Sequence, residues 1–343
     1  MVKTSKRSEL IVARQGRHSL GFITRGTMTQ TAFVTGATGL LGRQLVRAFQ
    51  DPGRDWNVKG VGLSRADGVS VLRVDLGKEN EVEAALDEIK PKVVVHSAAN
   101  RFPDKVDKDP EGTRALNVAA TRNLARLCAA RSILMIYIST DYVFPGREGE
   151  APYDVDATPS PPNLYGETKL EGEKAMFEEF EKAGKKGWGV VFRVPVLYGE
   201  AEVPEESAVN VLLNVVWGAQ QGKQTKMDNW SVRYPTNTQD VARVVADVAT
   251  KYLETEDKAS LPPILHFSSE DRTTKYKICE LLGQIMGLSI ENIISNDEGN
   301  DPSASVQRPY DCHLSTRALK ELGINVDTVE FKHWWERELT FRK

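Results

Sequence analysis

Short apolar runs alternate with amphipathic segments from residue 31 onward. A short apolar run predicts a buried strand, and a longer segment with apolar positions every three or four residues predicts a helix. The predicted strands cover residues 32–35, 58–63, 69–74, 93–95, 133–138 and 264–267, and the predicted helices cover 43–50, 79–89, 113–130 and 164–183. Strands that alternate with helices in this way are typical of an α/β fold with a doubly wound parallel sheet of the Rossmann type.

The alternation stops in two places, and this predicts how the chain divides. We expect residues 1–30 to form a basic arm, and residues 31–199 with 236–268 to form the Rossmann-type domain. Residues 200–235 with 269–343 are expected to form a smaller, interleaved C-terminal lobe that roofs the cleft of the sheet. Because the chain crosses between the two parts more than once, we do not expect the smaller lobe to fold alone.

Composition excludes several classes of protein. The chain has 343 residues, 40% of them hydrophobic and 27% charged, which is ordinary for a globular protein. No run approaches 18 consecutive apolar residues, so no membrane-spanning helix is expected. A net charge of -3 argues against a nucleic-acid partner. Three widely separated cysteines and the absence of a helical histidine pair predict a reduced, cytoplasmic compartment and no metal site.

The first 27 residues carry six basic side chains and one acidic side chain. An Arg-rich, acid-poor N-terminus is also typical of a mitochondrial transit peptide, so a mitochondrial location stays open beside the cytoplasmic one. We favour two simpler interpretations, a disordered arm or an upstream extension ahead of a start at Met28.

A glycine-rich turn joins the first predicted strand to the first predicted helix. Its three glycines are spaced so that backbone amides can approach a pyrophosphate at the N-terminus of the helix. The order of strand, turn and helix is the context that this motif requires, and tight packing alone does not explain all three glycines. The residues expected to bind a dinucleotide here are Gly36, Thr38, Gly39, Leu40, Leu41 and Gly42.

Residues after the second predicted strand bear on the choice of cofactor. A fold that prefers NAD places Asp or Glu there to hold the ribose 2′-hydroxyl, whereas this chain has Ser64 and Arg65. A guanidinium beside a hydroxyl suits a 2′-phosphate, so NADP is favoured over NAD. The alternative is that Arg65 is a solvated loop residue and Asp67 supplies the acidic group. Later strand ends are expected to line the cofactor, with Asp75 and Leu76 beside the adenine and Ala98 and Ala99 where the cofactor passes.

Tyr165 and Lys169 stand four residues apart on a predicted helix and so share one face. A nearby ammonium lowers the pKa of a phenol and makes it a usable proton donor near neutral pH. Thr140, at the end of the fifth predicted strand, is placed to hydrogen-bond the same substrate oxygen. Such a pair usually faces solvent, but together with the glycine turn it indicates a proton-transfer site.

From residue 31 onward the chain resembles the extended short-chain dehydrogenase/reductases. The resemblance implies that Thr140, Tyr165 and Lys169 form the family triad, with Lys169 also contacting the nicotinamide ribose. It implies hydride transfer between NADP (NADPH) and a carbonyl or alcohol carbon of a small molecule. The remaining positions that it assigns to cofactor binding are Asn117, Ser139, Arg193 and Pro195.

Short motifs place the resemblance in the dTDP-4-dehydrorhamnose reductase-like branch of that family. They lie at residues 139–144, 163–166 and 307–309. Tyr142 stands where a sugar-nucleotide dehydratase has Glu, so dehydration is disfavoured. Within the branch, residues 206–209, 227–236 and 274–276 are similar to the regulatory beta subunits of methionine adenosyltransferase. Bacterial reductases carry an Asp-Gln-x-Gly-x-Pro-Thr type of segment where residues 230–236 fall, and this departure weakens the reductase interpretation.

Aromatic residues gather near the C-terminal end, at Trp334, Trp335 and Phe341. Aromatic residues flanked by arginine are frequent at protein–protein interfaces. The resemblance implies that a similar tail enters the catalytic subunit, so residues Trp334–Lys343 are expected to contact methionine adenosyltransferase. The alternative is that the tryptophans pack on the chain's own last helix; both hold if Trp334 is internal and Phe341 external.

Two functions of different classes follow. The favoured hypothesis is an NADP-binding, non-catalytic regulatory subunit that docks on methionine adenosyltransferase and modulates S-adenosylmethionine synthesis. The second hypothesis is an active NADPH-dependent reductase of a 4-keto nucleotide sugar. The complete triad keeps the second hypothesis open, since a protein can retain a cofactor after it has lost its substrate.

Overall fold

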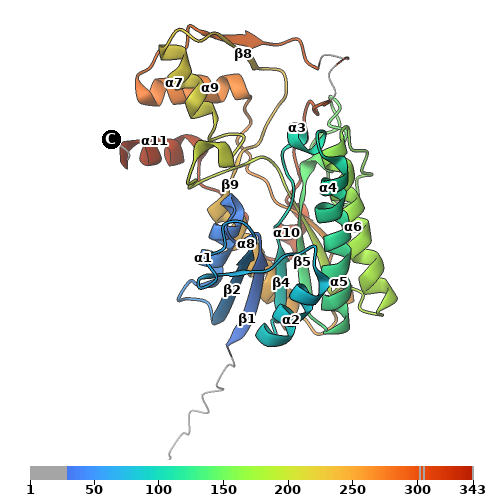
Figure 1. Cartoon of the computed structure of the whole chain (residues 1–343). Helices are drawn as coiled ribbons and strands as arrows, with labels where there is room; N and C mark the ends of the chain where they lie inside the picture. The colour runs from blue at the N-terminus through green and yellow to red at the C-terminus, as the bar shows by residue number, and fades with distance from the viewer. Residues whose placement is uncertain (1–28, 301–302, 304–305, 342–343) are drawn as a thin grey trace, which may run out of the picture.

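The computed structural model describes residues 29–300, 303 and 306–341 (Figure 1). Within them, a seven-stranded parallel sheet runs in the order β10-β6-β5-β4-β1-β2-β3. Its strands are β1 (Gln30–Thr35), β2 (Trp56–Gly62), β3 (Val71–Arg73), β4 (Val93–His96), β5 (Leu134–Thr140), β6 (Gly189–Val194) and β10 (Ile264–His266). The chain moves outward from β1 to β3 and then returns to β4 on the other side of β1. This confirms the doubly wound fold that the sequence predicts.

Helices cover both faces of the sheet (Figure 1). Helices α1 (Leu40–Phe49) and α8 (Thr238–Glu254) pack on one face, and α2 (Glu79–Ile89), α5 (Thr121–Ala130) and α6 (Leu164–Lys182) pack on the other. Strand β1 shows the consequence, because Ala32 and Val34 enter the first core while Phe33 enters the second. A strand buried on both faces needs apolar residues at successive positions, which explains the apolar runs in the sequence.

The helix predicted at 113–130 begins earlier and is not uniform. It consists of α4 (Pro110–Arg114), a π-helical segment Ala115–Ala120, and α5. The Asp109 side chain caps the start by accepting from the Gly112 amide at 3.0 Å. Asn117 lies in this π-helical segment, and such segments are frequent at functional sites.

A smaller lobe lies over the carboxyl ends of the strands (top of Figure 1). It contains α7 (Leu212–Gln220), α9 (Lys275–Met286), α11 (Phe331–Phe341) and the parallel pair β8 (Thr225–Asp228) and β11 (Ile293–Asn296). A second parallel pair, β7 (Leu197–Tyr198) and β9 (Thr236–Asn237), lies where the chain passes between the two parts. The lobe has its own apolar core, built from Tyr198, Val216, Leu282 and Trp335 among others.

Residues near the C-terminus are shared between the two parts. Helix α10 (Arg317–Glu321) packs Ala318 and Leu319 into the same core as α8 and the sheet, although the sequence assigns 269–343 to the smaller lobe. The chain then returns to the smaller lobe in α11. The two parts are therefore joined by several crossings of the chain.

The C-terminal tryptophans are internal. Trp334 and Trp335 are 3% and 1% exposed, and their rings meet edge to face at 4.9 Å between centroids. Both rings pack on Tyr198, Trp334 at 5.1 Å and Trp335 at 6.3 Å. Both tryptophans therefore pack within this chain, as the sequence alternative expects, but their partners include Tyr198 and are not confined to the last helix. The side chain of Phe341 and residues 342–343 lie outside the described residues, as does the arm at 1–28.

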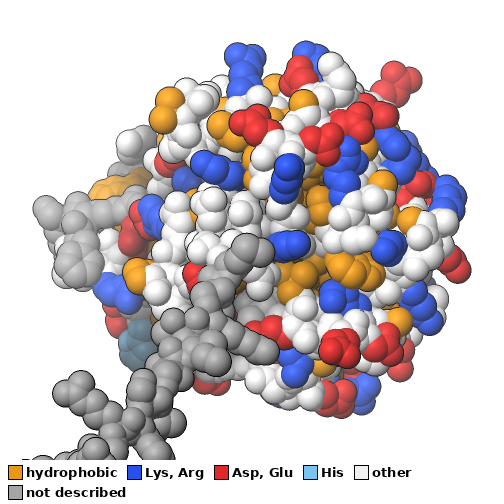
Figure 2. Space-filling model, turned by 90° about the horizontal axis from the view of Figure 1, so that it is seen from below, with side chains coloured by type: hydrophobic (Ala, Val, Ile, Leu, Met, Phe, Trp, Pro, Cys, Tyr) orange, Lys and Arg blue, Asp and Glu red, His pale blue; other side chains and the backbone are white. Residues whose placement is uncertain are grey.

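Charged side chains of both signs are interspersed on the face seen in Figure 2, which views the molecule from below. None of the helices in the described part of the chain has the length and apolarity needed to cross a membrane. Over the same residues, no cluster of His, Cys, Asp or Glu has the arrangement of a metal site.

Replacing Trp335 by Ala tests whether the C-terminal helix belongs to the folded core. Since Trp335 is 1% exposed, its loss is expected to lower the free energy of unfolding by about 3–5 kcal/mol. The measurement is urea unfolding followed by far-UV circular dichroism. Trp217→Ala is the control, because Trp217 on α7 is 55% exposed and its loss is expected to cost less than about 1 kcal/mol. Equal effects of the two substitutions would contradict this packing.

Candidate functional site

The turn between β1 and α1 is a close backbone contact. Gly36 has a φ of +67°, and a Cβ there would lie 2.9 Å from the Ala98 amide nitrogen. A Cβ on Gly42 would lie 2.0 Å from the Gly36 carbonyl oxygen. These two positions therefore require glycine, and they hold the first turn of α1 against the ends of β1 and β4.

The N-terminus of α1 is open to a ligand. Its N-cap residue is Gly39, and no side chain of the described residues caps it. The first amides of a helix carry partial positive charge and need an acceptor. Because Gly39 and Gly42 both line the cleft above the sheet, this end of α1 is shaped to hold a phosphate group.

The cleft runs from this turn to the smaller lobe and brings together much of the predicted site. The predicted residues that line it are Gly36, Gly39, Leu40, Leu41, Gly42, Ala99, Ser139, Thr140, Tyr165, Lys169 and Pro195. The predicted residues that are not part of this lining are Thr38, Ser64, Arg65, Asp75, Leu76, Ala98, Asn117 and Arg193. The cleft therefore joins the glycine turn to the Tyr165 and Lys169 pair, which lie more than 120 residues apart in the sequence.

Several residues of the second group act on the walls of the cleft. The Asn117 side chain accepts from the Asn100 amide at 2.9 Å and donates to the Asn100 carbonyl at 3.0 Å, so it fixes the loop after β4. Ala98 lies under Gly36 in the same loop. Leu76 is buried in the apolar core beside α2. The Asp75 carboxylate accepts from the Gly77 amide at 2.9 Å and shapes the end of β3.

Arg193 has an internal partner. Its guanidinium donates to the Glu173 carboxylate from Nε at 3.0 Å and from Nη2 at 2.6 Å, and both side chains are buried. The Ser139 hydroxyl also donates to Glu173. Glu173 thus joins Arg193 to Ser139, which lines the cleft, so Arg193 acts on the cleft through Glu173 and Ser139.

Helix α6 carries Tyr165 and Lys169 and is held tightly at its start. The Asn163 side chain accepts from the Gly166 amide at 3.1 Å and caps the helix. A Cβ on Gly166 would lie 2.1 Å from the Tyr142 carbonyl oxygen, so the helix is pressed against the end of β5. The rings of Tyr165 and Tyr142 meet at 6.0 Å between centroids. This contact places Tyr165 beside Thr140 in the cleft.

Electrostatics at the pair differ from the sequence expectation. Burial raises the pKa of Tyr165, and although interaction with the Thr140 side chain and with Arg101 opposes this, the net shift is upward. Burial also lowers the pKa of Lys169 to about 7, against the attraction of Glu173. The Lys169 ammonium donates to the Ile138 carbonyl at 2.7 Å and lies 3.9 Å from the centroid of the Tyr137 ring. Desolvation is therefore the largest cause of both pKa shifts.

The sequence reasoning missed a group of cations on the roof of the cleft. Arg233, Lys275 and Arg308 come from three segments of the smaller lobe and line the cleft together with Thr140 and Tyr142. Arg233 is 7% exposed, and its Nη2 has no hydrogen-bond partner among the described residues. The three residues lie in motifs used to recognise the family, but their spacing gave no sign that they converge.

Acidic residues accompany the roof cations. Asp104 pairs with Arg308 at 3.0 Å, and Asp228 lies 3.8 Å from the Arg233 guanidinium. Burial raises the pKa of Asp141 to about 7, while the hydrogen bond from Thr140 and the charge of Arg233 oppose the rise. A partly neutral Asp141 leaves the roof with an excess of positive charge near pH 7.

A second group that the sequence reasoning missed is centred on Glu206. Its carboxylate accepts from Arg43 at 2.6 Å and from Arg65 at 2.6 Å. Arg43 directly follows the third glycine of the turn, and this position was a signal that could have been used. Glu206 had no comparable signal, because 141 residues separate it from Arg65.

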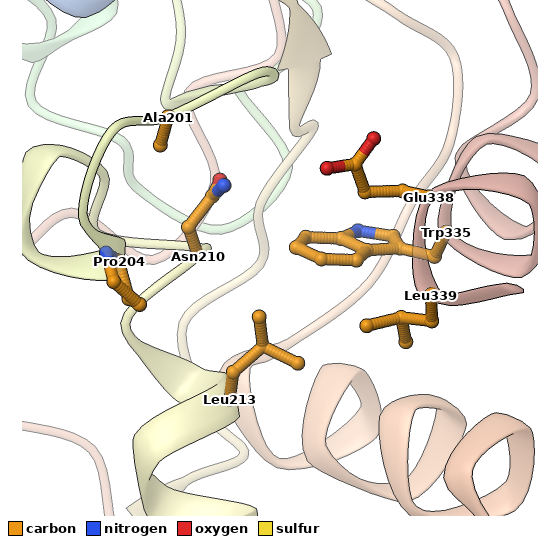
Figure 3. Close-up of a pocket in the computed structure, with 7 residues that line it drawn as sticks. All are labelled: Ala201, Pro204, Asn210, Leu213, Trp335, Glu338 and Leu339. Atoms are coloured by element: carbon orange, nitrogen blue, oxygen red, sulfur yellow. The ribbon is translucent and has the colours of Figure 1, made fainter. Parts of the chain in front are cut away.

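A smaller pocket lies between the segment after β7 and helix α11 (Figure 3). Asn210 and Leu213 face Trp335 and Leu339 across it. Its volume of about 10 Å³ is that of a single water molecule. We therefore assign no ligand to it.

The parallel fold, the glycine turn and the cleft define a dinucleotide-fold protein with a second lobe over the carboxyl ends of its strands. The model of the RmlD substrate binding domain matches residues 30–337, and the chain belongs to this family. The resemblance found in the sequence is thereby confirmed.

Methionine adenosyltransferase 2 subunit beta of Danio rerio is 38% identical over 308 residues, which are 90% of this chain and 89% of that protein. Among solved structures, dTDP-4-dehydrorhamnose reductase from Bacillus anthracis in complex with NADP has a TM-score of 0.73 at 20% identity, and covers 92% of this chain and 100% of its own. UDP-glucose 4-epimerase from Thermus thermophilus in complex with NAD has a TM-score of 0.72 at 21% identity, and covers 90% of this chain and 97% of its own. The two structures share the fold.

Gly42→Ala tests the role of the glycine turn. Since the added methyl group would lie 2.0 Å from the Gly36 carbonyl oxygen, the turn must open, and the affinity for NADPH is expected to fall at least about tenfold, or roughly 1.4 kcal/mol. Isothermal titration calorimetry measures the change. Gly218→Ala is the matched control, because its added Cβ meets Lys223 at an ordinary 3.5 Å. Unchanged binding by the Gly42 variant would place the dinucleotide elsewhere.

Proposed function

We propose that this chain is an NADP-binding regulatory subunit of methionine adenosyltransferase and that it modulates the synthesis of S-adenosylmethionine. The observation that carries the proposal is the identity of 38% with the zebrafish beta subunit, because the match covers nearly the whole of both chains. A match of that extent includes the smaller lobe, where sugar-nucleotide reductases and regulatory subunits are expected to differ. We also propose the cytoplasm as its compartment, and the free, buried thiols of Cys128, Cys279 and Cys312 agree with a reducing one.

A nicotinamide dinucleotide fits the cleft. The open N-terminus of α1 and the glycine turn suit its pyrophosphate, and Arg65 with Arg43 suits the 2′-phosphate of NADP. Ser139, Thr140, Tyr165 and Pro195 line the part of the cleft proposed for the nicotinamide. Asn117 and Arg193 are proposed to act by fixing the walls, through Asn100 and Glu173. Asp75 and Leu76 remain the proposed neighbours of the adenine, and Ala98 and Ala99 remain the proposed neighbours of the cofactor where it passes the end of β4.

The C-terminal segment Trp334–Lys343 is proposed to contribute to the contact with the catalytic subunit. Its two tryptophans are buried in the core of the smaller lobe, so they anchor α11 to this chain. The side chains of α11 that face outward include Lys332, His333 and Arg337. The partner contact is therefore assigned to this outer face and to the residues that follow, with the tryptophans as its rigid base.

One observation favours a second candidate, an NADPH-dependent reductase of a 4-keto nucleotide sugar. The roof cations Arg233, Lys275 and Arg308 lie across the cleft from the triad, where they suit the diphosphate of a nucleotide sugar. In that reaction a bound NADPH supplies the hydride. Thr140 holds the substrate carbonyl, and the Tyr165 phenol gives its proton to the carbonyl oxygen as the alcohol forms.

Co-purification with a methionine adenosyltransferase catalytic subunit tests the favoured function. We expect a stable complex on size-exclusion chromatography and at least about a twofold change in the rate of S-adenosylmethionine formation. Deletion of residues 337–343 is expected to weaken the complex, because it removes the end of the proposed contact while leaving both tryptophans in place. Absence of any complex with the full chain, at micromolar concentrations of both proteins, would exclude the regulatory function.

Oxidation of NADPH with a panel of 4-keto nucleotide sugars separates the two candidates. A reductase turns over at least one of them, and Tyr165→Phe lowers kcat by about 100-fold or more because the proton donor is lost. The regulatory function predicts no turnover together with tight binding of NADPH. Turnover that survives Tyr165→Phe would contradict the role given to the phenol.

A further inference from the structure

The Glu206 carboxylate lies at the adenosine end of the cleft although it comes from the smaller lobe. It ends the short turn Pro204–Glu206 and is 7% exposed. Arg43 donates to both of its oxygens, at 3.2 Å and 2.6 Å, and Arg65 donates to Oε1 at 2.6 Å. The Glu202 amide also donates to Oε2 at 3.1 Å. This is a buried acid held by two guanidinium groups of the other part of the molecule.

The two arginines mark where the adenosine ribose belongs. Arg43 Nη1 donates to the Thr38 carbonyl at 2.7 Å, so its guanidinium lies on the glycine turn. Arg65 follows β2, and the end of the second strand is where dinucleotide folds carry the group that recognises the ribose 2′-position. Glu206 is in contact with both, so it occupies the same edge of the cleft.

The neighbouring acid Asp67 is engaged elsewhere. Its carboxylate accepts from the amides of Val69, Ser70 and Val71, each at 2.9 Å, and so closes its own loop. The sequence alternative in which Asp67 holds the ribose is therefore not favoured by its geometry. Glu206, from a distant part of the chain, is a buried carboxylate that meets Arg65 just after β2.

Glu206 carries a full negative charge. Burial alone would raise its pKa, but the hydrogen bonds from Arg43 and Arg65 outweigh burial and hold the pKa at about 2. An ionised carboxylate accepts a hydrogen bond from a hydroxyl and repels a phosphate. The same position therefore has opposite consequences for the two nicotinamide dinucleotides.

We infer that Glu206 is a specificity-determining residue for the cofactor. Its carboxylate accepts a hydrogen bond from the ribose 2′-hydroxyl of NADH, and it must release Arg43 and Arg65 before these can hold the 2′-phosphate of NADPH. The inference rests on the proposed function only in that the cleft binds a nicotinamide dinucleotide. It predicts that this chain prefers NADPH over NADH by less than it would if Arg43 and Arg65 were not held by Glu206. It also makes the smaller lobe part of the choice of cofactor.

Removing the charge of Glu206 tests the inference. In Glu206→Gln the two arginines lose their buried partner and keep only the exposed Glu202, which lies 3.0 Å from Arg65 and 3.4 Å from Arg43. The repulsion of the 2′-phosphate by Glu206 is lost, while NADH loses a charged acceptor. We expect the ratio of the dissociation constants for NADH and NADPH to rise at least tenfold, a change of about 1.4 kcal/mol. The constants are measured by isothermal titration calorimetry at one salt concentration, because screening alters such contacts.

Glu205→Gln is the matched control. Glu205 lies on the same turn, is exposed, and accepts from Asn214 at 2.7 Å on the side away from the arginines. The substitution removes the same charge one residue away, and the ratio is expected to stay within about twofold of the original. An equal rise in both variants would assign the effect to the overall charge of the turn and overturn the inference.

Arg65→Gln gives a second test. The Arg65 side chain is 46% exposed, so the substitution is expected to leave the fold intact. It is expected to weaken NADPH at least fivefold and NADH less than twofold. In its presence Glu206→Gln should have a smaller effect on the ratio, since one of the two freed guanidinium groups is gone. A ratio that Glu206→Gln leaves unchanged in the original chain overturns the inference alone, whereas failure of the original chain to bind either dinucleotide overturns the proposed function as well.

Discussion

The close contact between the first turn of α1 and the ends of β1 and β4 is the constraint on which the site depends. A Cβ on Gly42 would lie 2.0 Å from the Gly36 carbonyl, and a Cβ on Gly36 would lie 2.9 Å from the Ala98 amide. Only backbone can fill this space, so the N-terminus of α1 opens onto the cleft, and no side chain of the described residues caps it. The position of α1 in turn places Arg43 over the glycine turn, from which it reaches Glu206.

The second lobe completes the site as well as covering it. It provides the cations Arg233, Lys275 and Arg308 on the roof and the acid Glu206 beside Arg43 and Arg65. Because β7 pairs with β9 and α10 packs into the core of the sheet, the lobe is tied to the domain at several points. The lobe and the walls of the cleft are therefore held together by several direct contacts.

Burial decides the electrostatic character of Tyr165 and Lys169. It raises the pKa of Tyr165 and lowers that of Lys169 to about 7, because each ionised form loses water and the compensating contacts are too few. A neutral Tyr165 phenol agrees with both functions considered for this chain. It is the form that donates a proton in a reductase, and a regulatory subunit needs no proton transfer. The roof cations and the buried Asp141 distinguish the cleft from a bare cofactor groove.

The sequence by itself determined the layers of the fold and the ends of the strands where the site lies. Apolar runs such as Val93–Val95 predict strands buried on both faces, and the strand–turn–helix order around Gly36 predicts the dinucleotide turn, because both signals are local. The π-helical segment at Ala115–Ala120 and the convergence of Arg43, Arg65 and Glu206 were decided only by tertiary structure. A salt bridge between residues 141 positions apart leaves no periodic pattern in the chain, and desolvation at Tyr165 depends on every element that packs around it.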